Sequence, residues 1–289
     1  MKILVFGGTG FLGSALCKTI ISRGYSLTVA DVKQPNFDCR YLYCNIQNAE
    51  HIETCVSQGF QVVINLAGYS NMRQSILQPI LTIELNVLSN MWIVESCLRH
   101  GVGHFLYASS AYATSNKGSF YAISKRMSEQ VIEEYAKRGN MDYNIIRYGS
   151  VYSNFLSHNN GMYKLVDDLL NNCEYHYEGH EDEIREYIHA DDASSLTLEL
   201  LENDKYRNRT VYFTGNQSFK RSELFEIIKE TGAVDTKIFY IQSKEVDNYK
   251  STPFTLLAEP ALRFTPNPGC DLSQGIYEIV RAIKEKRGC

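Results

Sequence analysis

The chain has 289 residues, of which 44% are hydrophobic and 21% are charged, and its formal net charge at pH 7 is −4. This composition is ordinary for a globular protein with a hydrophobic core, and the length allows one large domain or two small ones. The slightly acidic balance argues against a nucleic-acid-binding surface and against a basic membrane-binding patch.

Neither targeting signals nor metal-site patterns are found. No apolar stretch approaches the ~20 residues that a membrane span needs, and the apolar run at 3–6 is too short for the core of a signal peptide. The eight cysteines form no CxxC pair, and none has zinc-site spacing with a histidine. We therefore expect a cytoplasmic protein with free thiols and no metal site.

Short apolar strands alternate with helical patterns in the first half of the chain. This alternation is typical of a parallel sheet that is covered by helices on both faces. In chain order, the expected strands are 3–6, 27–30, 62–66, 104–108 and 143–147. The expected helices are 11–23, 82–100 and 121–138, and each ends before a glycine.

The pattern loosens after about residue 150. Four of the six prolines lie between residues 253 and 268, which predicts a loop-rich segment at 254–269 that could cover a substrate. A strand is expected at 211–214. The expected helices are 161–172, 191–202, 222–231 and 276–286.

A glycine-rich loop, GGTGFLG at 7–13, joins the first strand directly to the first helix. Gly7 permits a tight turn, Gly10 lets the backbone approach a pyrophosphate, and Gly13 lets helix and strand pack closely. The helix then presents free N–H groups and a positive dipole end to the phosphates. The alternative is a purely structural turn, but the strand–loop–helix context favours dinucleotide binding.

Asp31 ends the second expected strand, 18 residues after Gly13. A carboxylate at this place can accept both ribose hydroxyls of an adenosine and would repel a 2′-phosphate, which favours NAD over NADP. Asp31 could instead be a turn former, and the nearby Lys33 works against the preference for NAD.

Tyr121 and Lys125 form a YxxxK motif at the start of a helix, where a spacing of four places both side chains on one face. A neighbouring ammonium lowers a phenol's pKa from about 10 toward neutral, where tyrosine can act as acid or base. A surface Tyr–Lys pair is the alternative. Ser110 supports the catalytic interpretation, because it closes the preceding strand at the sheet edge where ligands bind.

At this point the sequence resembles the extended short-chain dehydrogenase/reductase family, in its branch of nucleotide-sugar epimerases and dehydratases. The resemblance covers most of the chain and adds five segments to the glycine loop and YxxxK motif. They are VVINLAG at 62–68, Asn86-Val87, ASSA at 108–111, RYGSVY at 147–152 and REYIHADD at 185–192.

The resemblance implies an α/β fold with a Rossmann doubly wound parallel sheet and a smaller C-terminal α/β substrate-binding part. Residues 1–149 would form the NAD-binding Rossmann domain, with roughly 187–215 returning to it. Residues 150–186 and 216–289 would form the substrate-binding part.

The family also implies roles for individual residues. Tyr121 exchanges a proton with a sugar hydroxyl, Lys125 holds the nicotinamide ribose, and Ser110 hydrogen-bonds the same sugar hydroxyl. Ser150 and Arg185 lie at substrate-binding positions, and a planar guanidinium suits a diphosphate; a surface salt bridge is the alternative for Arg185. The NAD-binding positions are Gly7, Thr9, Gly10, Phe11, Leu12, Gly13, Asp31, Asn45, Ile46, Leu66, Ala67, Gly68, Asn86, Ala108, Tyr121, Lys125, Tyr148 and Val151.

The chain departs from the family pattern in several places. Only ten residues separate Ser110 from Tyr121, a shorter loop than is usual, so the acceptor pocket would be more open. Ser150 replaces a diphosphate-contacting asparagine, and Asn45-Ile46 replaces an Asp-Ile adenine contact. Ala111-Tyr112 stands where 4,6-dehydratases have an Asp-Glu pair, which argues against dehydration by this chain.

We therefore expect an NAD-dependent nucleotide-sugar epimerase-like oxidoreductase that transfers hydride at a ring hydroxyl, commonly C4. A single-step dehydrogenase or 4-ketoreductase would use the same residues. A non-catalytic NAD sensor is a third reading, but the intact Ser110, Tyr121 and Lys125 set argues against it. The expected partner is a nucleotide-diphosphate sugar, with no nucleic acid and no membrane.

We also expect a homodimer. In the family, the helices that correspond to 82–100 and 121–138 form a four-helix interface across a twofold axis. Their apolar positions exceed what one core-facing stripe needs. These positions are Val87, Trp92, Ile93, Met127, Val131 and Ile132.

Overall fold

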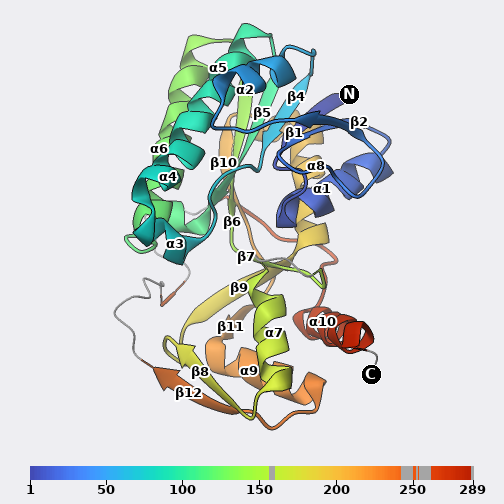
Figure 1. Cartoon of the computed structure of the whole chain (residues 1–289), viewed down its shortest axis with the longest axis vertical. Coiled ribbons are helices and arrows are strands. Elements are labelled where there is room, and N and C mark those ends of the chain that lie inside the picture. The colour runs from blue at the N-terminus through green and yellow to red at the C-terminus, as the bar shows by residue number, and fades with distance from the viewer. Residues whose placement is uncertain (156–159, 242–249, 252, 254–261, 288–289) are drawn as a thin grey trace.

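A computed structural model describes residues 1–155, 160–241, 250–251, 253 and 262–287 (Figure 1). Its main feature is an eight-stranded parallel sheet in the order β13-β10-β6-β5-β4-β1-β2-β3. The α/β fold with a doubly wound parallel sheet is thereby confirmed. The strands are β1 (Lys2–Phe6), β2 (Ser26–Asp31), β3 (Arg40–Tyr43), β4 (Val62–Asn65), β5 (His104–Ser110), β6 (Asp142–Tyr148), β10 (Arg209–Phe213) and β13 (Arg263–Phe264).

The first strand shows why the sheet is buried on both faces. Successive side chains of a strand point to opposite faces, and Ile3 and Val5 enter one core cluster while Leu4 and Phe6 enter another. All four are completely buried. A continuous apolar run is therefore the expected signature of a central parallel strand.

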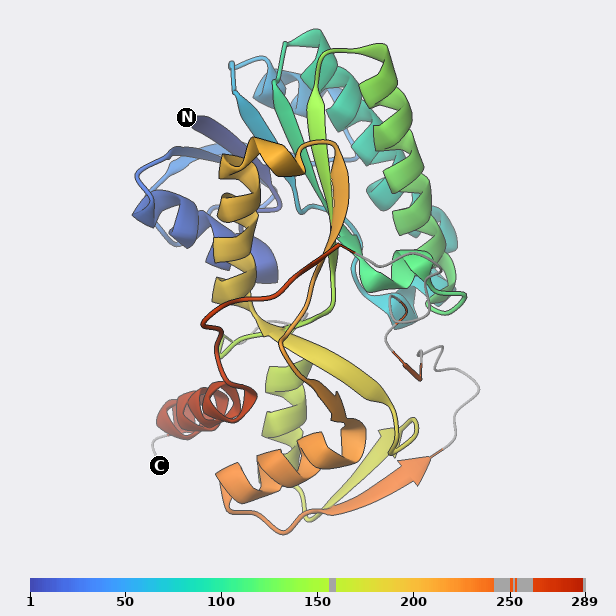
Figure 2. The same cartoon turned by 180° about the vertical axis from the view of Figure 1, so that it is seen from behind.

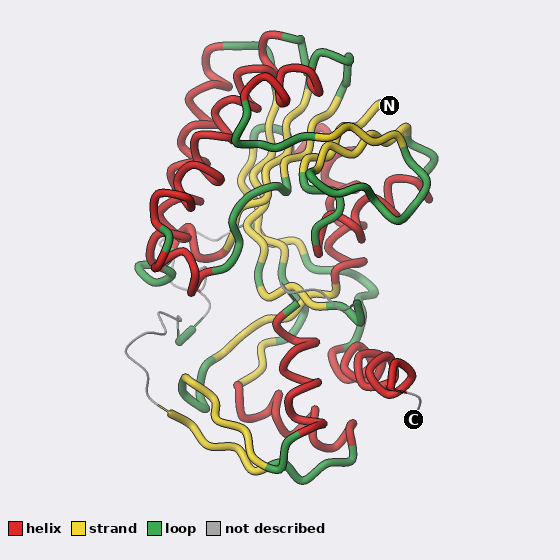
Figure 3. Tube along the Cα trace, in the orientation of Figure 1, coloured by secondary structure: helices red, strands yellow, loops and turns green. Residues whose placement is uncertain are grey.

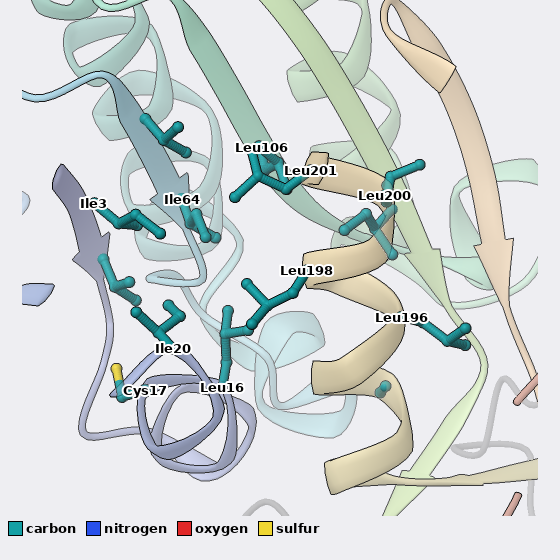
Figure 4. Packing of buried hydrophobic residues seen from close by; sticks show 14 of the residues in the cluster. Ile3, Leu16, Cys17, Ile20, Ile64, Leu106, Leu196, Leu198, Leu200 and Leu201 are labelled. Carbon is teal, nitrogen blue, oxygen red and sulfur yellow. The ribbon is translucent and has the colours of Figure 1, made fainter. Parts of the chain in front are cut away.

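Helices cover each face of the sheet. The helices α1 (Phe11–Ser22) and α8 (Ala190–Glu202) pack together on one face, where Figure 4 shows Leu16 of α1 meeting Leu198 of α8 beside Ile64. The other face carries α2 (Ala49–Val56), α5 (Ser89–Arg99) and α6 (Ser119–Arg138).

The helix expected at 82–100 is longer and less regular than its sequence pattern indicates. It begins as α4 (Pro79–Ile83), passes through a π-helical turn (Glu84–Leu88) and continues as α5. The start moves upstream because proline is well suited to the first helical position. A short helix, α3 (Met72–Leu77), precedes it.

A smaller part of the chain lies beyond the carboxyl ends of the large sheet (Figure 3). It has its own apolar core, in which helices pack against two small sheets. Its strands are β7 (Ser150–Tyr152), β9 (Ile184–His189) and β11 (Ser218–Lys220) in one sheet, and β8 (Glu174–Glu178) and β12 (Lys237–Ile241) in the other. Its helices are α7 (Gly161–Asn171), α9 (Arg221–Gly232) and α10 (Leu272–Arg287).

The chain crosses between the two parts more than once. After β9 it rises through α8 back to the large sheet, where β10 pairs with β6 (Figure 2). Arg263 and Phe264 also join that sheet as its edge strand β13, although the expected division gives 216–289 to the substrate-binding part. The exact division stays a prediction.

Part of the expected loop at 254–269 is therefore a strand. Phe264 packs at the edge of the core with its ring centroid 4.7 Å from that of Tyr206, which gives this short strand a half-buried anchor. Residues 254–261 of the expected loop lie outside the described residues.

Membrane-spanning helices, metal-binding clusters and cysteine pairing can also be examined in the described residues. None of the described helices is long and apolar enough to cross a membrane. Within the described residues, no cluster of three or more His, Cys, Asp or Glu side chains could hold a metal ion. The seven described cysteines are free thiols.

Candidate active site

A cavity of about 910 Å³ opens at the carboxyl ends of β1, β2, β4 and β5, where parallel sheets of this kind bind ligands. Of the predicted site residues, Asn86, Ser150 and Arg185 do not line it. The predicted residues that do line it are Gly7, Thr9, Gly10, Phe11, Leu12, Gly13, Asp31, Asn45, Ile46, Leu66, Ala67, Gly68, Ala108, Ser110, Tyr121, Lys125, Tyr148 and Val151.

The glycine loop forms a backbone cradle at one end of the cavity. Gly7 has a φ of +78°, which favours glycine. A Cβ atom on Gly13 would lie 2.1 Å from the carbonyl oxygen of Gly7. Gly10 is the N-cap of α1 and has no side chain that could cap the helix. The first N–H groups of α1 therefore stay available to phosphate oxygens.

Asp31 lies beside this cradle at the end of β2. Its Oδ2 accepts a hydrogen bond from the backbone N–H of Thr9 at 3.0 Å, and its Oδ1 accepts one from Lys33 at 3.2 Å. An ionised carboxylate has about four lone-pair sites, so two ribose hydroxyls can still be accepted. The glycine cradle and this carboxylate together fit the adenosine and pyrophosphate of NAD.

Lys125 lies at the other end of the cavity, one helical turn after Tyr121. Its side chain is buried, and Nζ donates to the carbonyl oxygen of Ala108 at 2.7 Å and to Tyr107 Oη at 3.3 Å. Nζ is 5.9 Å from the ring centroid of Tyr121. Burial lowers the pKa of Lys125 to about 8, while the Glu129 carboxylate acts in the opposite direction.

Ser110 is the last residue of β5 and is also buried. Its Oγ accepts a hydrogen bond from the backbone N–H of Tyr112 at 3.3 Å. The Tyr112 ring lies edge-on to Tyr121, with 6.4 Å between the two centroids. The β5–α6 connection thereby brings the serine, the tyrosine and the lysine to the same cavity.

The short connection between Ser110 and Tyr121 is a 3₁₀ turn (Ala111–Thr114) followed by a tight loop. Arg126 of α6 fixes it by donating to the carbonyl oxygens of Ala113 and Ser115, each at 2.8 Å. The turn therefore has a defined position although the connection is short.

A buried ionic network contacts Ser109, the residue before Ser110 in β5. Arg147 of β6 donates to both carboxylate oxygens of Glu129, at 2.9 and 2.6 Å, and Ser109 Oγ donates to the same carboxylate. Arg147 also donates to Tyr212 Oη at 2.9 Å. The Glu129 charge near Lys125 is thus largely balanced by Arg147.

Asn86 lies within the π-helical turn rather than in the cavity wall. Its Oδ1 accepts from the backbone N–H of Tyr69 at 2.6 Å, and its Nδ2 donates to the Tyr69 carbonyl at 3.0 Å and to Ser124 Oγ at 2.8 Å. The structure therefore places this predicted cofactor contact between the loop after β4 and helix α6. Its neighbour Leu85 lines the cavity instead.

Arg185 lies on β9 in the smaller part and is buried, with 5% of its surface exposed. It forms an ion pair with Glu183 at 3.0 Å and donates to the carbonyl oxygen of Ile184 at 2.9 Å. The ion pair is therefore buried rather than on the surface. Ser150 lies on β7 and is also outside the lining of the cavity.

Sequence reasoning missed several residues of the cavity. Some of them precede or follow predicted contacts in loops at strand ends, and that position is the signal that could have revealed them. The missed lining residues are Ala30, Val32, Lys33, Cys44, Gln47, Ser70, Asn71, Leu85, Ser109, Gly149 and Gly161.

Comparison with known proteins identifies the family to which this arrangement belongs. Residues 3–213 match the model of the NAD dependent epimerase/dehydratase family. The chain belongs to this family. The expected resemblance and the expected NAD cofactor are thereby confirmed, and the matched residues include the cradle, Asp31, Ser110, Tyr121 and Lys125.

Relatives of the epimerase/dehydratase family span the whole chain. A putative UDP-glucose 4-epimerase of Methanocaldococcus jannaschii is 24% identical over 305 residues, which cover 98% of each protein. The solved UDP-glucose 4-epimerase of Thermotoga maritima with UDP-glucose has a TM-score of 0.86 at 22% identity and covers 99% of this chain and 100% of that one. MoeE5 in complex with UDP-glucuronic acid and NAD has a TM-score of 0.85 at 17% identity, with full coverage of both chains.

Proposed function

We propose that the protein is an NAD-dependent nucleotide-sugar epimerase that acts at the C4 hydroxyl of the sugar. The observation that carries this proposal is the convergence of Ser110, Tyr121 and Lys125 on a cavity whose other end is a pyrophosphate cradle. A proton carrier and a dinucleotide site that share one cavity suit the oxidation of an alcohol.

Each catalytic side chain has a distinct role in this proposal. Tyr121 accepts the proton of the sugar hydroxyl, Ser110 hydrogen-bonds that hydroxyl, and the Lys125 ammonium favours the phenolate form of Tyr121. Lys125 still has a donor for a ribose hydroxyl, because an ammonium has three N–H groups. When bound, NAD would supply a reversible hydride acceptor, and Tyr121 would return the proton when the hydride goes back to the other face of the keto sugar.

The residues of the cavity favour epimerisation over dehydration. Elimination of water across two carbons needs a further acid and base beside the tyrosine. Among the described residues that line the cavity, Asp31 is the only carboxylate, and it lies at the adenosine end. Ala111 is buried and Tyr112 packs against Tyr121, so neither supplies an acid–base pair of the Asp-Glu kind.

The substrate is proposed to be a nucleotide-diphosphate sugar, with Arg185 and Ser150 on the side of the diphosphate. A guanidinium suits phosphate oxygens. Its buried ion pair with Glu183 at 3.0 Å means that a diphosphate would have to share Arg185 with a carboxylate. Replacing Glu183 with glutamine is therefore expected to tighten binding of uridine diphosphate, the nucleotide part of the UDP-glucose bound by the Thermotoga relative.

A homodimer is proposed through the two helices expected to form it, together with α3 and α4 and with a different set of side chains. Val87, Ile93 and Ile132 are buried in the core, so using them as interface residues was wrong. Exposed apolar side chains gather instead on α3, α4, the π-helical turn and α6, which contact one another. They are Ile76, Leu77, Ile80, Leu88, Phe120, Ile123 and Met127, with Leu77 73% and Ile80 74% exposed.

The proposed reaction can be tested with UDP-glucose and NAD. The expected result is conversion of UDP-glucose to UDP-galactose, followed by chromatography or NMR, with no net accumulation of NADH. Stoichiometric NADH release would instead identify a single-step dehydrogenase. If no member of a panel of nucleotide sugars reacts or protects the protein from thermal unfolding, the epimerase proposal is wrong.

A further inference from the structure

Lys125 has a buried partner that the proposed mechanism does not use. Tyr107 of β5 has 1% of its surface exposed, and its Oη is 3.3 Å from Lys125 Nζ. The ammonium also lies over the Tyr107 ring, 4.8 Å from its centroid. Tyr107 therefore contacts Lys125 from the side of the sheet, behind the cavity.

Ser128 of α6 lies next to the Tyr107 hydroxyl. Ser128 Oγ donates to the backbone carbonyl of Asn86 at 2.7 Å, and the Ser124 carbonyl at 2.9 Å is its second acceptor. Ser128 and Asn86 are both buried. Asn86 is held in turn by Ser124 and by the loop after β4.

The hydrogen bond between Lys125 and Tyr107 has one direction while Lys125 is charged. An ammonium has no lone pair and can only donate, so Tyr107 Oη accepts from Lys125. The neighbouring Ser128 is held by its own hydrogen bond to Asn86 in the π-helical turn, and such turns are frequent at functional sites.

We propose that Tyr107 is a positioning residue that holds the Lys125 side chain near Tyr121 and stabilises its ammonium form. This inference rests on the proposed function of the site. It does not exchange protons with the substrate, because burial raises its pKa well above the usual range of tyrosine and keeps it neutral.

The surroundings of Lys125 explain why a neutral acceptor matters. Burial disfavours the ammonium. The charged and titratable groups that face it are Tyr107 from β5 and Tyr121 and Glu129 from its own helix. Since Glu129 is itself paired with Arg147, the Tyr107 and Ala108 oxygens are the direct acceptors that stabilise the charge.

The test is the titration of Lys125 in the free protein, measured by NMR on lysine labelled with ¹³C at Cε and assigned with Lys125→Arg. The wild-type midpoint is expected near 8. Tyr107→Phe keeps the ring but removes the acceptor, so the midpoint should fall by about one pH unit. Ser128→Ala, which removes the hydroxyl beside Tyr107 Oη, should loosen the position of that oxygen and produce a smaller fall in the same direction.

Tyr212→Phe is the matched control, because it also removes a buried hydroxyl that hydrogen-bonds a cation, here Arg147. It should lower stability without moving the Lys125 titration. An unchanged midpoint in Tyr107→Phe would overturn the inference. Should Tyr107→Phe fail to fold, an unchanged midpoint in Ser128→Ala alone would do so.

A second measurement separates this inference from the proposed function. In single-turnover hydride transfer, Tyr107→Phe should move the alkaline limb of the pH profile to lower pH, because neutral Lys125 no longer supports the phenolate of Tyr121. If the alkaline limb of the pH profile does not move in an active Tyr107→Phe enzyme, the role of Tyr107 is wrong but the proposed function still stands. Absence of hydride transfer in the wild type contradicts the proposed function and leaves the NMR test intact.

Discussion

Replacement of Gly13 by alanine is the most direct test of the cofactor cradle. The added Cβ would lie 2.1 Å from the carbonyl oxygen of Gly7 and 2.9 Å from Cα of Gly8. A carbon–oxygen contact needs about 3.2 Å or more, so the loop or the helix must move by roughly 1 Å. Overpacking of this kind costs about 1–3 kcal/mol of folding stability.

The same displacement acts directly on NAD binding, because Gly7 and the N-terminus of α1 are the parts that move. We expect the dissociation constant for NAD to rise at least about tenfold, which corresponds to about 1.4 kcal/mol. Isothermal titration calorimetry measures this rise, and urea unfolding measures the change in stability.

Gly103→Ala is the control for this substitution. A Cβ on Gly103 would meet nothing closer than 3.6 Å, and its φ lies outside the glycine-favouring region. It should leave NAD binding unchanged. If Gly13→Ala binds NAD as tightly as the wild type, the loop is a structural turn and the cradle assignment is refuted.

The other predictions concern catalysis, cofactor choice, assembly and pH. Tyr121→Phe should slow single-turnover hydride transfer by about 10²–10⁴-fold while NAD still binds. A wild-type rate in this variant would show that the assignment of Tyr121 as the catalytic residue is wrong. NAD should bind more tightly than NADP because of Asp31, and Asp31→Ser should reduce that difference; calorimetric titrations that show no difference in the wild type contradict the argument. The double substitution Leu77→Asp and Ile80→Asp should give a monomer by light scattering, whereas a wild-type monomer at micromolar concentration would rule out the dimer. Burial lowers the pKa of His104 to about 4, so the unfolded state binds more protons than the folded state below about pH 6.5. The free energy of unfolding should therefore fall by up to about 3 kcal/mol between pH 6.5 and pH 4. Urea unfolding of His104→Gln should show a correspondingly smaller fall.

Local sequence patterns were enough to predict six of the eight strands of the central sheet and the dinucleotide loop. A strand that is buried on both faces is mostly apolar, and the apolar runs at 3–6, 62–64 and 105–108 show this directly in the sequence. The glycine loop is equally local, because a turn, a phosphate approach and a helix start occur within residues 7–13. The strand β3 and the helix α2 were missed, since β3 is a half-exposed edge strand without a continuous apolar run.

Motif spacing predicted the catalytic trio but not its supports. Tyr121 and Lys125 share a helix face by their spacing alone, whereas the Tyr107 and Ser128 contacts depend on how β5 packs against α6. The π-helical turn at Asn86 has no sequence signature that we could read. It places Asn86, an expected cofactor contact, between a loop and a helix and outside the lining of the cavity.

Exposure and long-range pairing were decided only by the tertiary structure. Helical periodicity marks apolar positions but not which of them meet the sheet, so Ile93 is core and Ile80 is exposed. Arg185 was identified by its motif, yet its burial against Glu183 depends on the packing of β9. Phe264 pairs with Phe213, 51 residues away, and a two-residue strand carries too little periodicity to reveal its partner. The sequence by itself therefore determined the elements with strong local signals, and the packing of those elements determined which side chains face the site, the core or the solvent.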